Sequence, residues 1–454
     1  MKNLYIIFLL LTGLFIGVSY KIKDDYFYLP YPNAIEYVLV LLLLLVTAVV
    51  LIGKKHRRKK LFTGLAAAAT LLIVVNCMNY FFEWHPLNLS LPFTDSQSFE
   101  VSHEPYQWQR ATPESAGYDQ EEIEQYLKEI GGWERLRGLI VIKEGKVIVE
   151  KYQKGATKFS AFNVHSVTKS ITSALTGLAI QNGYLASENA YVMPLFPEYQ
   201  KGGQNLQKEK LTVAHLLSMR GGFTGWDGPQ NVEQVIMEEE VSESKLGQEF
   251  NYFTGSQMVL SALITKASKT TTKEFAQEKL FKPLGIQCGF WRKMDGYYAG
   301  GDETYFTARD LARFGELYLN NGKVNGVQLL DSSWVNKSFT NYTSESKAFR
   351  NLDCYQENGY GYSWWLLNYK DKPVYTARGK GGQYILILPE QKTVAVILQE
   401  WNLQKDFGKE NAYLCQLLSI LTKEETRLPT ARHISKTVAT FCPPRVQERY
   451  SQFA

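Results

Sequence analysis

The stretch Ser166-Val167-Thr168-Lys169-Ser170-Ile171-Thr172-Ser173-Ala174-Leu175 carries the strongest signal for the fold of this chain. Apolar residues recur at helical spacing through it and beyond it, so we expect a helix that begins near Ser166 and buries one face. Residues three apart on a helix share a face, which places the Lys169 amine over the Ser166 hydroxyl. A serine becomes a good nucleophile when a neighbouring base takes its proton. The pattern therefore predicts the chemistry of a serine hydrolase.

Two interpretations of this motif stay open on its four residues alone. Ser166 is also a good helix N-cap, with Lys169 solvated in the first turn. The same Ser-x-x-Lys spacing recurs at Ser242–Lys245 and Ser344–Lys347, both in polar, charged surroundings. Only the first copy precedes an apolar helical face, and this context favours the nucleophile.

The beginning of the 454-residue chain has the character of a membrane protein. Residues 4–20, 35–52 and 61–82 are apolar stretches with at most one charge each. Each is long enough to span a hydrocarbon core of about 30 Å. The first stretch continues without a small-residue cleavage pattern, which favours a retained helix over a signal peptide. We therefore expect three transmembrane helices within residues 1–84.

A strongly basic loop, Gly53–Lys60, separates the second and third apolar stretches. Lysine and arginine in short loops mark the cytoplasmic side of a membrane. The part of the chain after the third helix is then extracytoplasmic, and the protein is a multi-pass protein of the cell membrane with the lipid bilayer as a partner. This loop contributes +6 to a net charge of +5, so the remainder is close to neutral and no nucleic-acid partner is expected.

The rest of the chain divides into three parts. Residues 85–112 contain three prolines and are predicted to be a linker. Residues 113–425 are predicted to form the hydrolase domain, and residues 426–454 a poorly packed tail. In this domain we expect, in chain order, a capped helix after Thr112-Pro113-Glu114-Ser115, a hairpin over 136–150 around Gly145, helices over 213–219, 257–267 and 308–320, strands over 360–367, 383–388 and 393–398, and a closing helix over 411–421.

Cysteine and histidine give no metal pattern. The five cysteines are scattered, without the paired spacing of a zinc site, and the histidines likewise form no ligand pair. We predict no metal and no cofactor. One or two disulfides are compatible with the four cysteines of the extracytoplasmic part, but the sequence does not indicate their pairing. These cysteines are Cys288, Cys354, Cys415 and Cys442.

A Ser-Lys hydrolase also needs a group that passes a proton to the leaving group and an N–H pair that stabilises the oxyanion. Tyr252 lies in the stretch 247–255, just before the predicted helix 257–267. In a chain with 28 tyrosines, this position alone does not distinguish a catalytic tyrosine from a surface or core one.

Several stretches in order resemble the serine β-lactamase and penicillin-binding-protein-like superfamily, in particular its class C, esterase and aminohexanoate-oligomer hydrolase branch. The resemblance covers about residues 112 to 423. Its landmarks are Thr112–Asp119, Ser166-x-x-Lys169, Leu211–Met219, Gly247-x-x-Phe250-x-Tyr252-x-Thr254, Thr307–Gly315, Tyr360–Trp365 and Gly379-Lys-Gly-Gly-Gln383-Tyr384.

The resemblance implies an α/β fold, β-lactamase/transpeptidase-like, in which helices flank an antiparallel sheet and a helical region is inserted. It implies Ser166, Lys169 and Tyr252 as catalytic residues. The oxyanion hole would use the backbone N–H groups of Ser166 and Lys380, with a neighbour in 377–381 as the alternative for Lys380. The implied substrate-binding residues are Thr254, Trp226, Gly381, Gly382 and Gln383.

Some positions depart from the family pattern. Thr254 replaces a frequent asparagine, which weakens a β-lactamase interpretation because a hydroxyl replaces an amide contact. Lys380-Gly381-Gly382 replaces Lys-Thr-Gly or His-x-Gly, and Arg220-Gly221-Gly222 replaces Thr-Ser-Gly. His215 is interpreted as a structural residue behind the site, and His165 as a packing or cleft-wall residue rather than a base. At least one of Trp364 and Trp365 is expected in the core.

The expected protein is a membrane-anchored extracytoplasmic serine hydrolase that forms an acyl-enzyme on Ser166 from an ester or amide. Its substrate would be a small molecule or an envelope polymer. Two alternatives remain: a D-Ala-D-Ala carboxypeptidase or related peptidase, and a membrane sensor or binding module with little turnover. The sequence does not predict the oligomeric state.

Overall fold

The computed structural model describes residues 98–199, 206–225, 231–294, 296–343, 354–400 and 407–422. All of them belong to one compact unit, Asp95–Ala454. The three predicted transmembrane helices and the tail 426–454 lie outside the described residues. Within the described part, no helix combines the length and the apolar character needed to cross a bilayer.

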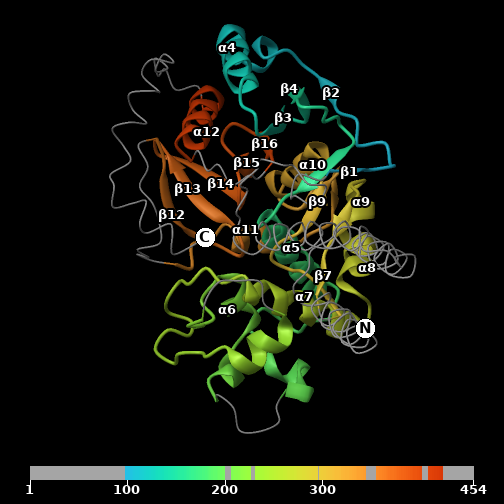
Figure 1. Cartoon of the computed structure of the whole chain (residues 1–454), viewed down its shortest axis with the longest axis vertical. Coiled ribbons are helices and arrows are strands. Elements are labelled where there is room, and N and C mark those ends of the chain that lie inside the picture. Colours follow the sequence, from blue (N-terminus) through green and yellow to red (C-terminus); the bar gives the residue numbers. More distant parts are fainter. Residues whose placement is uncertain are drawn as a thin grey trace, which may run out of the picture. The chain divides into compact units, whose positions relative to one another are not determined.

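An eight-stranded sheet forms the centre of this unit (Figure 1). Neighbouring strands are antiparallel, except for the short parallel pair β2 and β4. In sheet order, the strands are β12 (Gln356–Tyr360), β13 (Trp365–Tyr369), β14 (Lys372–Gly379), β15 (Gln383–Leu388), β16 (Thr393–Gln399), β3 (Leu136–Lys143), β4 (Lys146–Tyr152) and β2 (Gln109–Arg110).

Both faces of the sheet are buried, which its alternating side chains explain. On β3, Ile140 and Ile142 pack into one core, while Leu139 and Val141 pack into the other. The first core contains α5 (Val167–Gln181), α7 (Gly255–Ser268) and α10 (Ala308–Leu319). The second contains α4 (Gln120–Gly131) and α12 (Phe407–Leu421). The sheet is therefore the middle layer between two sets of helices.

The remaining elements are short. The further helices are α6 (Val213–Leu217), α8 (Thr272–Ala276), α9 (Lys282–Leu284) and α11 (Ser332–Ser338), with 3-10 turns η1 (Glu114–Ala116), η2 (Met193–Leu195), η3 (Pro197–Tyr199) and η4 (Lys208–Lys210) and π-turns η5 (Gln234–Glu238) and η6 (Gln277–Phe281). A four-stranded sheet has the order β1 (Phe99–Glu100), β5 (Ser160–Asn163), β9 (Thr304–Phe306) and β6 (Phe290–Trp291). Two more sheets have two strands each: one pairs β10 (Lys323–Val324) with β11 (Val327–Gln328), and the other pairs β7 (Lys293–Met294) with β8 (Tyr297–Tyr298).

Most sequence-based elements are confirmed, with three corrections. The helix after Thr112 is α4, but its cap is Asp119, whose carboxylate accepts from the Glu121 and Glu122 amides. The expected strand 360–367 is wrong, because β12 ends at Tyr360 and a turn separates it from β13. Ser363 in that turn has φ 63°, which breaks a strand. Strand β14 was not predicted.

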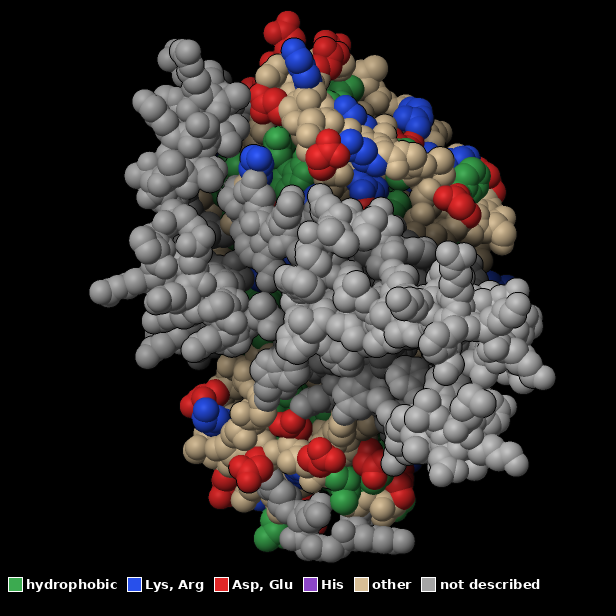
Figure 2. Space-filling model, viewed as in Figure 1, with side chains coloured by type: hydrophobic (Ala, Val, Ile, Leu, Met, Phe, Trp, Pro, Cys, Tyr) green, Lys and Arg blue, Asp and Glu red, His purple; other side chains and the backbone are tan. Residues whose placement is uncertain are grey.

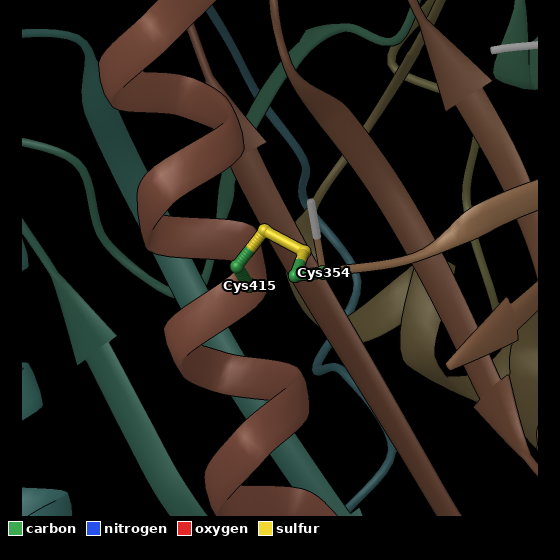
Figure 3. Close-up of a disulfide and its surroundings, with 2 residues drawn as sticks. All are labelled: Cys354 and Cys415. Atoms are coloured by element: carbon green, nitrogen blue, oxygen red, sulfur yellow. A yellow bond between two sulfur atoms is a disulfide. The ribbon is translucent and has the colours of Figure 1, made fainter. Parts of the chain in front are cut away.

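A disulfide joins Cys354, just before β12, to Cys415 on α12 (Figure 3). The bridge ties the edge strand of the sheet to the helix that covers one of its faces. Cys288 is a buried free thiol, and burial raises its pKa to about 12, so it is poorly suited to act as a nucleophile. Charged side chains of both signs are interspersed around α4 on the surface (Figure 2).

Candidate active site

Ser166 occupies the N-cap position of α5, but its side chain makes no capping hydrogen bond. Instead, its Oγ accepts a hydrogen bond of 3.0 Å from Nζ of Lys169. The Lys169 side chain is 1% exposed, so it is not a solvated first-turn lysine. The structure thus favours the interpretation of this pair as a nucleophile and its base over that of a simple helix cap.

Two further groups surround the Lys169 amine. Its Nζ donates to the Gly301 carbonyl oxygen at 2.8 Å, and it lies 4.9 Å from the centroid of the Tyr252 ring. A buried amine without partners would be costly, and these contacts compensate for its lost water. They also fix its direction, because Ser166 and Gly301 are held by different parts of the chain.

The second copy of the motif lacks this environment. Ser242 and Lys245 lie in a turn, and the Lys245 amine forms an ion pair with Glu249 at 3.3 Å. The Lys245 side chain is 46% exposed. The third copy, Ser344–Lys347, lies outside the described residues. Burial therefore separates the candidate catalytic pair from Ser242–Lys245.

Tyr252 is held in a loop by its anchored neighbours. The Asn251 amide donates to the Met219 carbonyl at 2.8 Å, and the Asn251 side chain donates to the Phe223 carbonyl at 2.8 Å. Phe253 is completely buried. The Tyr252 ring stacks on Trp365 with centroids 5.5 Å apart, and it remains partly exposed beside Lys169. The structure therefore brings together the three predicted catalytic residues.

Thr254 occupies the N-cap position of α7, and its side chain makes no capping hydrogen bond. A Cβ built on Gly301 would approach Thr254 Cγ2 to 2.6 Å, so Thr254 packs against the residue whose carbonyl binds Lys169. This contact places Thr254 at the base of the site. Its predicted contact with substrate stays a prediction, and Trp226 lies outside the described residues.

The turn between β14 and β15 forms the opposite wall of the site. A Cβ on Gly379 would lie 2.3 Å from the carbonyl oxygen of Val164, two residues before Ser166, so only glycine allows this approach. Gly381 and Gly382 adopt φ of 101° and 89°. The turn therefore brings the Lys380 backbone beside the nucleophile segment, while the Lys380 side chain is exposed. The choice of the Lys380 N–H for the oxyanion hole stays a prediction.

Gln383 has a different environment from the one expected of a substrate-binding side chain. It is completely buried, and its Nε2 donates to the Gln399 carbonyl on β16 at 2.6 Å. The Gln383 side chain thus links the start of β15 to the end of the neighbouring strand β16 by a hydrogen bond. Gly381 and Gly382 are also buried, in the turn itself.

The two histidines near the site have local roles. His165 has a left-handed φ of 46°, and its amide donates to the Asn163 side chain at 2.8 Å. His215 completes a capping box with Thr212 at the start of α6, and burial lowers its pKa, with the Arg220 charge adding to the effect. Neither contact recruits a histidine as the base for Ser166.

Sequence reasoning did not identify Gly301 as a partner of Lys169 or Trp365 as the partner of Tyr252. Gly301 is 132 residues from Lys169, and its backbone carbonyl carries no residue-specific signal. The tandem tryptophans did give a signal, since one of the pair was expected in the core. Both are core residues: Trp364 has no exposed surface and packs into the first core, and Trp365 is 8% exposed and packs into the second.

Comparison with known proteins agrees with this architecture. The family model described as Beta-lactamase matches residues 123–417, more than half of the chain. The chain belongs to the beta-lactamase family. The matched range contains Ser166, Lys169, Tyr252 and the β14–β15 turn.

Among individual relatives, the 6-aminohexanoate-dimer hydrolase of Paenarthrobacter ureafaciens is 22% identical over 290 residues, which is 58% of this chain and 72% of that protein. A Bacillus anthracis protein provisionally assigned as a 6-aminohexanoate-dimer hydrolase has a similar structure, with a TM-score of 0.56 at 18% identity over 73% of this chain and 92% of its own. EstCE1, a hydrolase with promiscuous acyltransferase activity, gives a TM-score of 0.53 at 14% identity over 66% of this chain and 97% of its own. At these identities the solved structures establish the shared fold.

Proposed function

We propose that this protein is an esterase or amidase that forms an acyl-enzyme on Ser166. The observation that carries the proposal is the 3.0 Å hydrogen bond between Lys169 Nζ and Ser166 Oγ, made by a lysine that is almost completely buried. Membership of the beta-lactamase family, with a 6-aminohexanoate-dimer hydrolase as a relative and the hydrolase EstCE1 as a structural neighbour, supports it.

The reaction follows from this arrangement. Lys169 accepts the proton as Ser166 Oγ attacks the substrate carbonyl carbon, and the negative charge develops on the carbonyl oxygen. The backbone N–H groups of Ser166 and Lys380 stabilise that oxygen. The leaving group departs as the alcohol or amine after Tyr252 passes a proton to it, while Lys169 returns a proton to Tyr252. Water then attacks the acyl-enzyme and releases the acid, which restores the Ser166 hydroxyl.

We further propose that the hydrolase domain is extracytoplasmic and anchored by the apolar stretches of residues 1–84. The basic loop Gly53–Lys60 supports this orientation. The Cys354–Cys415 disulfide also supports it, because such bonds persist in oxidising compartments. A substrate in the cell envelope, such as an acyl ester or peptide amide on a wall polymer, fits this location.

The chemical proposal is tested with the full chain, its Ser166→Ala variant and a matched Ser242→Ala control from the exposed Ser242–Lys245 copy. Each protein is incubated with a fluorophosphonate probe, a p-nitrophenyl acyl ester and a labelled penicillin. We expect labelling and ester turnover by the wild type and the control, and neither by Ser166→Ala.

The other outcomes separate the alternatives. A long-lived penicillin adduct on Ser166 without ester turnover would point to a peptidase or sensor instead. If Ser166→Ala keeps its labelling and turnover, the nucleophile is another residue. For the location, a reporter enzyme that is active only outside the membrane is fused after Thr112. A second reporter, active only in the cytoplasm, is fused at the same position. If the first reporter is inactive and the second is active, the extracytoplasmic assignment is wrong.

A further inference from the structure

A buried arginine, Arg135, holds the β14–β15 turn through a hydrogen bond to Gly381. Arg135 directly precedes β3 and is 6% exposed. Its Nη2 donates to the Gly381 carbonyl at 2.5 Å, and its Nε donates to the Glu400 carbonyl at 3.1 Å. One guanidinium therefore contacts both the turn and the residue that directly follows β16. Arg135 and Gly381 are 246 residues apart in the sequence.

The turn needs such a support. Gly381 and Gly382 both have positive φ, and glycine loses more backbone freedom than other residues when it is fixed. Inside the turn, the Gly382 amide donates to the Gly379 carbonyl at 3.2 Å. Gly379 itself is pressed against Val164. The contact from Arg135 to Gly381 therefore fixes the turn at its far end.

The charge of Arg135 is in turn balanced by α12. Its Nη1 lies 4.0 Å from the Glu410 carboxylate, and Glu410 also accepts a 2.6 Å hydrogen bond from the hydroxyl of Tyr384 on β15. A buried guanidinium is costly unless it is paired and hydrogen-bonded. Arg135 meets both conditions through groups that surround the β14–β15 turn.

We propose that Arg135 is a positioning residue for the oxyanion hole: by holding the Gly381 carbonyl, it keeps the N–H of the β14–β15 turn directed at the oxygen of the acyl group on Ser166. This inference rests on the proposed serine hydrolase function. It predicts that Arg135 contributes to kcat without touching the substrate, and that Glu410 on α12 supports it.

The neighbouring Arg137 provides a matched control. It pairs with the Glu400 carboxylate, and its Nη1 donates to the Glu134 carbonyl at 2.8 Å. Its side chain is 14% exposed, so its replacement also removes a largely buried ion pair at the same end of β3. None of these contacts reaches the turn. Comparing Arg135→Met with Arg137→Met therefore distinguishes the effect of losing the Gly381 contact from the effect of losing any arginine at this end of β3.

The experiment uses the full chain as wild type, Arg135→Met, Arg135→Lys and Arg137→Met. We measure kcat and KM for a p-nitrophenyl ester, the inhibition constant of an alkyl boronic acid, and hydrogen exchange of the amides in residues 379–383. Boronic acids form a tetrahedral adduct on serine and therefore report the oxyanion hole rather than substrate binding.

We expect Arg135→Met to lower kcat about tenfold to a hundredfold, which is less than the roughly 10²–10³-fold effect of deleting a donor outright. KM should change less than threefold, and the boronic acid should weaken by the same factor as kcat. Exchange in 379–383 should rise in Arg135→Met and stay at the wild-type level in Arg137→Met. Arg135→Lys should restore part of each property that Arg135→Met loses. A lysine amine can donate to one of the two carbonyls, Gly381 or Glu400, but it lacks the guanidinium fork that contacts both.

Two results would overturn the proposal: unchanged exchange in 379–383 for Arg135→Met, or equal losses of kcat and boronate affinity in Arg135→Met and Arg137→Met. Hydrogen exchange needs no substrate, so it tests the contact between Arg135 and the turn even if the wild type fails to hydrolyse esters. An inactive wild type without fluorophosphonate labelling would count against the proposed function instead.

Discussion

Tyr252 and Trp365 stack with ring centroids 5.5 Å apart and an interplanar angle of 29°. The Arg378 guanidinium lies 4.4 Å from the Trp365 ring, so the tryptophan is itself fixed by its contacts on the sheet. The glutamate partner of Arg378 is Glu357, at 2.7 Å. Although burial disfavours the charge, this carboxylate raises the pKa of Arg378 and keeps it cationic. The orientation of the Tyr252 ring thus depends on a stack anchored in β12, β13 and β14.

Replacing Trp365 with leucine should lower kcat about twofold to tenfold, because the stack contributes about 0.5–1.5 kcal/mol to holding Tyr252. Trp365→Phe should retain most of the activity. The contrast is Trp364→Leu, which removes a core side chain on the other face and should lower the unfolding midpoint while the folded fraction keeps its kcat. Steady-state kinetics and thermal unfolding of the same samples provide the comparison. Equal kcat for Trp365→Leu and wild type would show that the stack does not orient Tyr252.

Lys169→Met should lower ester turnover about 10²–10⁴-fold, the usual range for loss of a general base. The change keeps an unbranched apolar stem but removes the amine, which leaves the Gly301 carbonyl and the Ser166 hydroxyl without their donor. The matched control is Lys245→Met, from the exposed copy of the motif, which should have wild-type rates. Burst-phase kinetics with the p-nitrophenyl ester checks the acylation step. A normal burst in Lys169→Met would assign the base to another group.

Gly379→Ala should abolish the close approach of the β14–β15 turn to Val164. Its Cβ would lie 2.3 Å from the Val164 carbonyl, so the backbone must move and the oxyanion hole with it. Gly132→Ala is a suitable control, because Gly132 has φ −79° and its Cβ would be 3.4 Å from the nearest carbonyl. We expect kcat to fall in Gly379→Ala and to stay at the wild-type value in Gly132→Ala. Circular dichroism first verifies that both variants are folded. Full activity in Gly379→Ala would mean that the turn does not need this contact.

The Cys354–Cys415 bridge should stabilise the hydrolase domain. It joins residues 61 apart, and closing a loop of this size typically contributes about 2–4 kcal/mol. Reductant should therefore lower the urea midpoint of the wild type, and the double variant Cys354→Ser/Cys415→Ser should start from the lower midpoint and not respond to reductant. A reductant effect in the double variant would assign the stabilisation to other cysteines.

His103 should make stability fall as pH rises above about 6.5, the usual pKa of a histidine in the unfolded chain. The Asp310 carboxylate, 3.5 Å from its Nε2, raises the pKa of His103 against the opposing effect of burial. A raised folded pKa means that the stabilisation is present below about pH 6.5, the usual value of the unfolded chain, and is lost as pH rises through the folded pKa. His103→Gln should remove this dependence. Urea unfolding between pH 5.5 and 8.5 measures it, and an identical pH profile in the variant would contradict it.

The sequence predicted the local parts of the site better than the long-range ones. Ser166 and Lys169 are three residues apart on one helix, so their contact follows from helix geometry alone. Tyr252 needed the resemblance to a known family, because its partners Lys169 and Trp365 are distant in the chain. The contact between Arg135 and Gly381 leaves no local pattern, and nothing in the sequence pointed to it.

The same distinction explains the errors in the fold. Asp119 was not recognised as the helix cap because the stretch Thr112–Ser115 also resembles a helix start. In the structure that stretch leads into the separate 3-10 turn η1, which is ended by Gly117 in a left-handed conformation before α4 begins. The run 360–367 is apolar and aromatic like a strand, yet Ser363 turns the chain within it. Strand β14 contains Pro373 and charged residues, so its pattern was weak, although four of its eight residues are buried and the other four half-buried, with a paired strand on each side.

The pairing of β3 with β16 joins strands from opposite ends of the described chain, with Val141 opposite Ala395. A ribosome makes the segment that contains Ser166 long before it makes β14, β15 and β16. Ser166 therefore leaves the exit tunnel before the β14–β15 turn and the strand that closes the sheet have been made. The candidate active site is therefore incomplete during synthesis. It is assembled late, when the last strand takes its place beside β3 and the β14–β15 turn reaches the Ser166 segment.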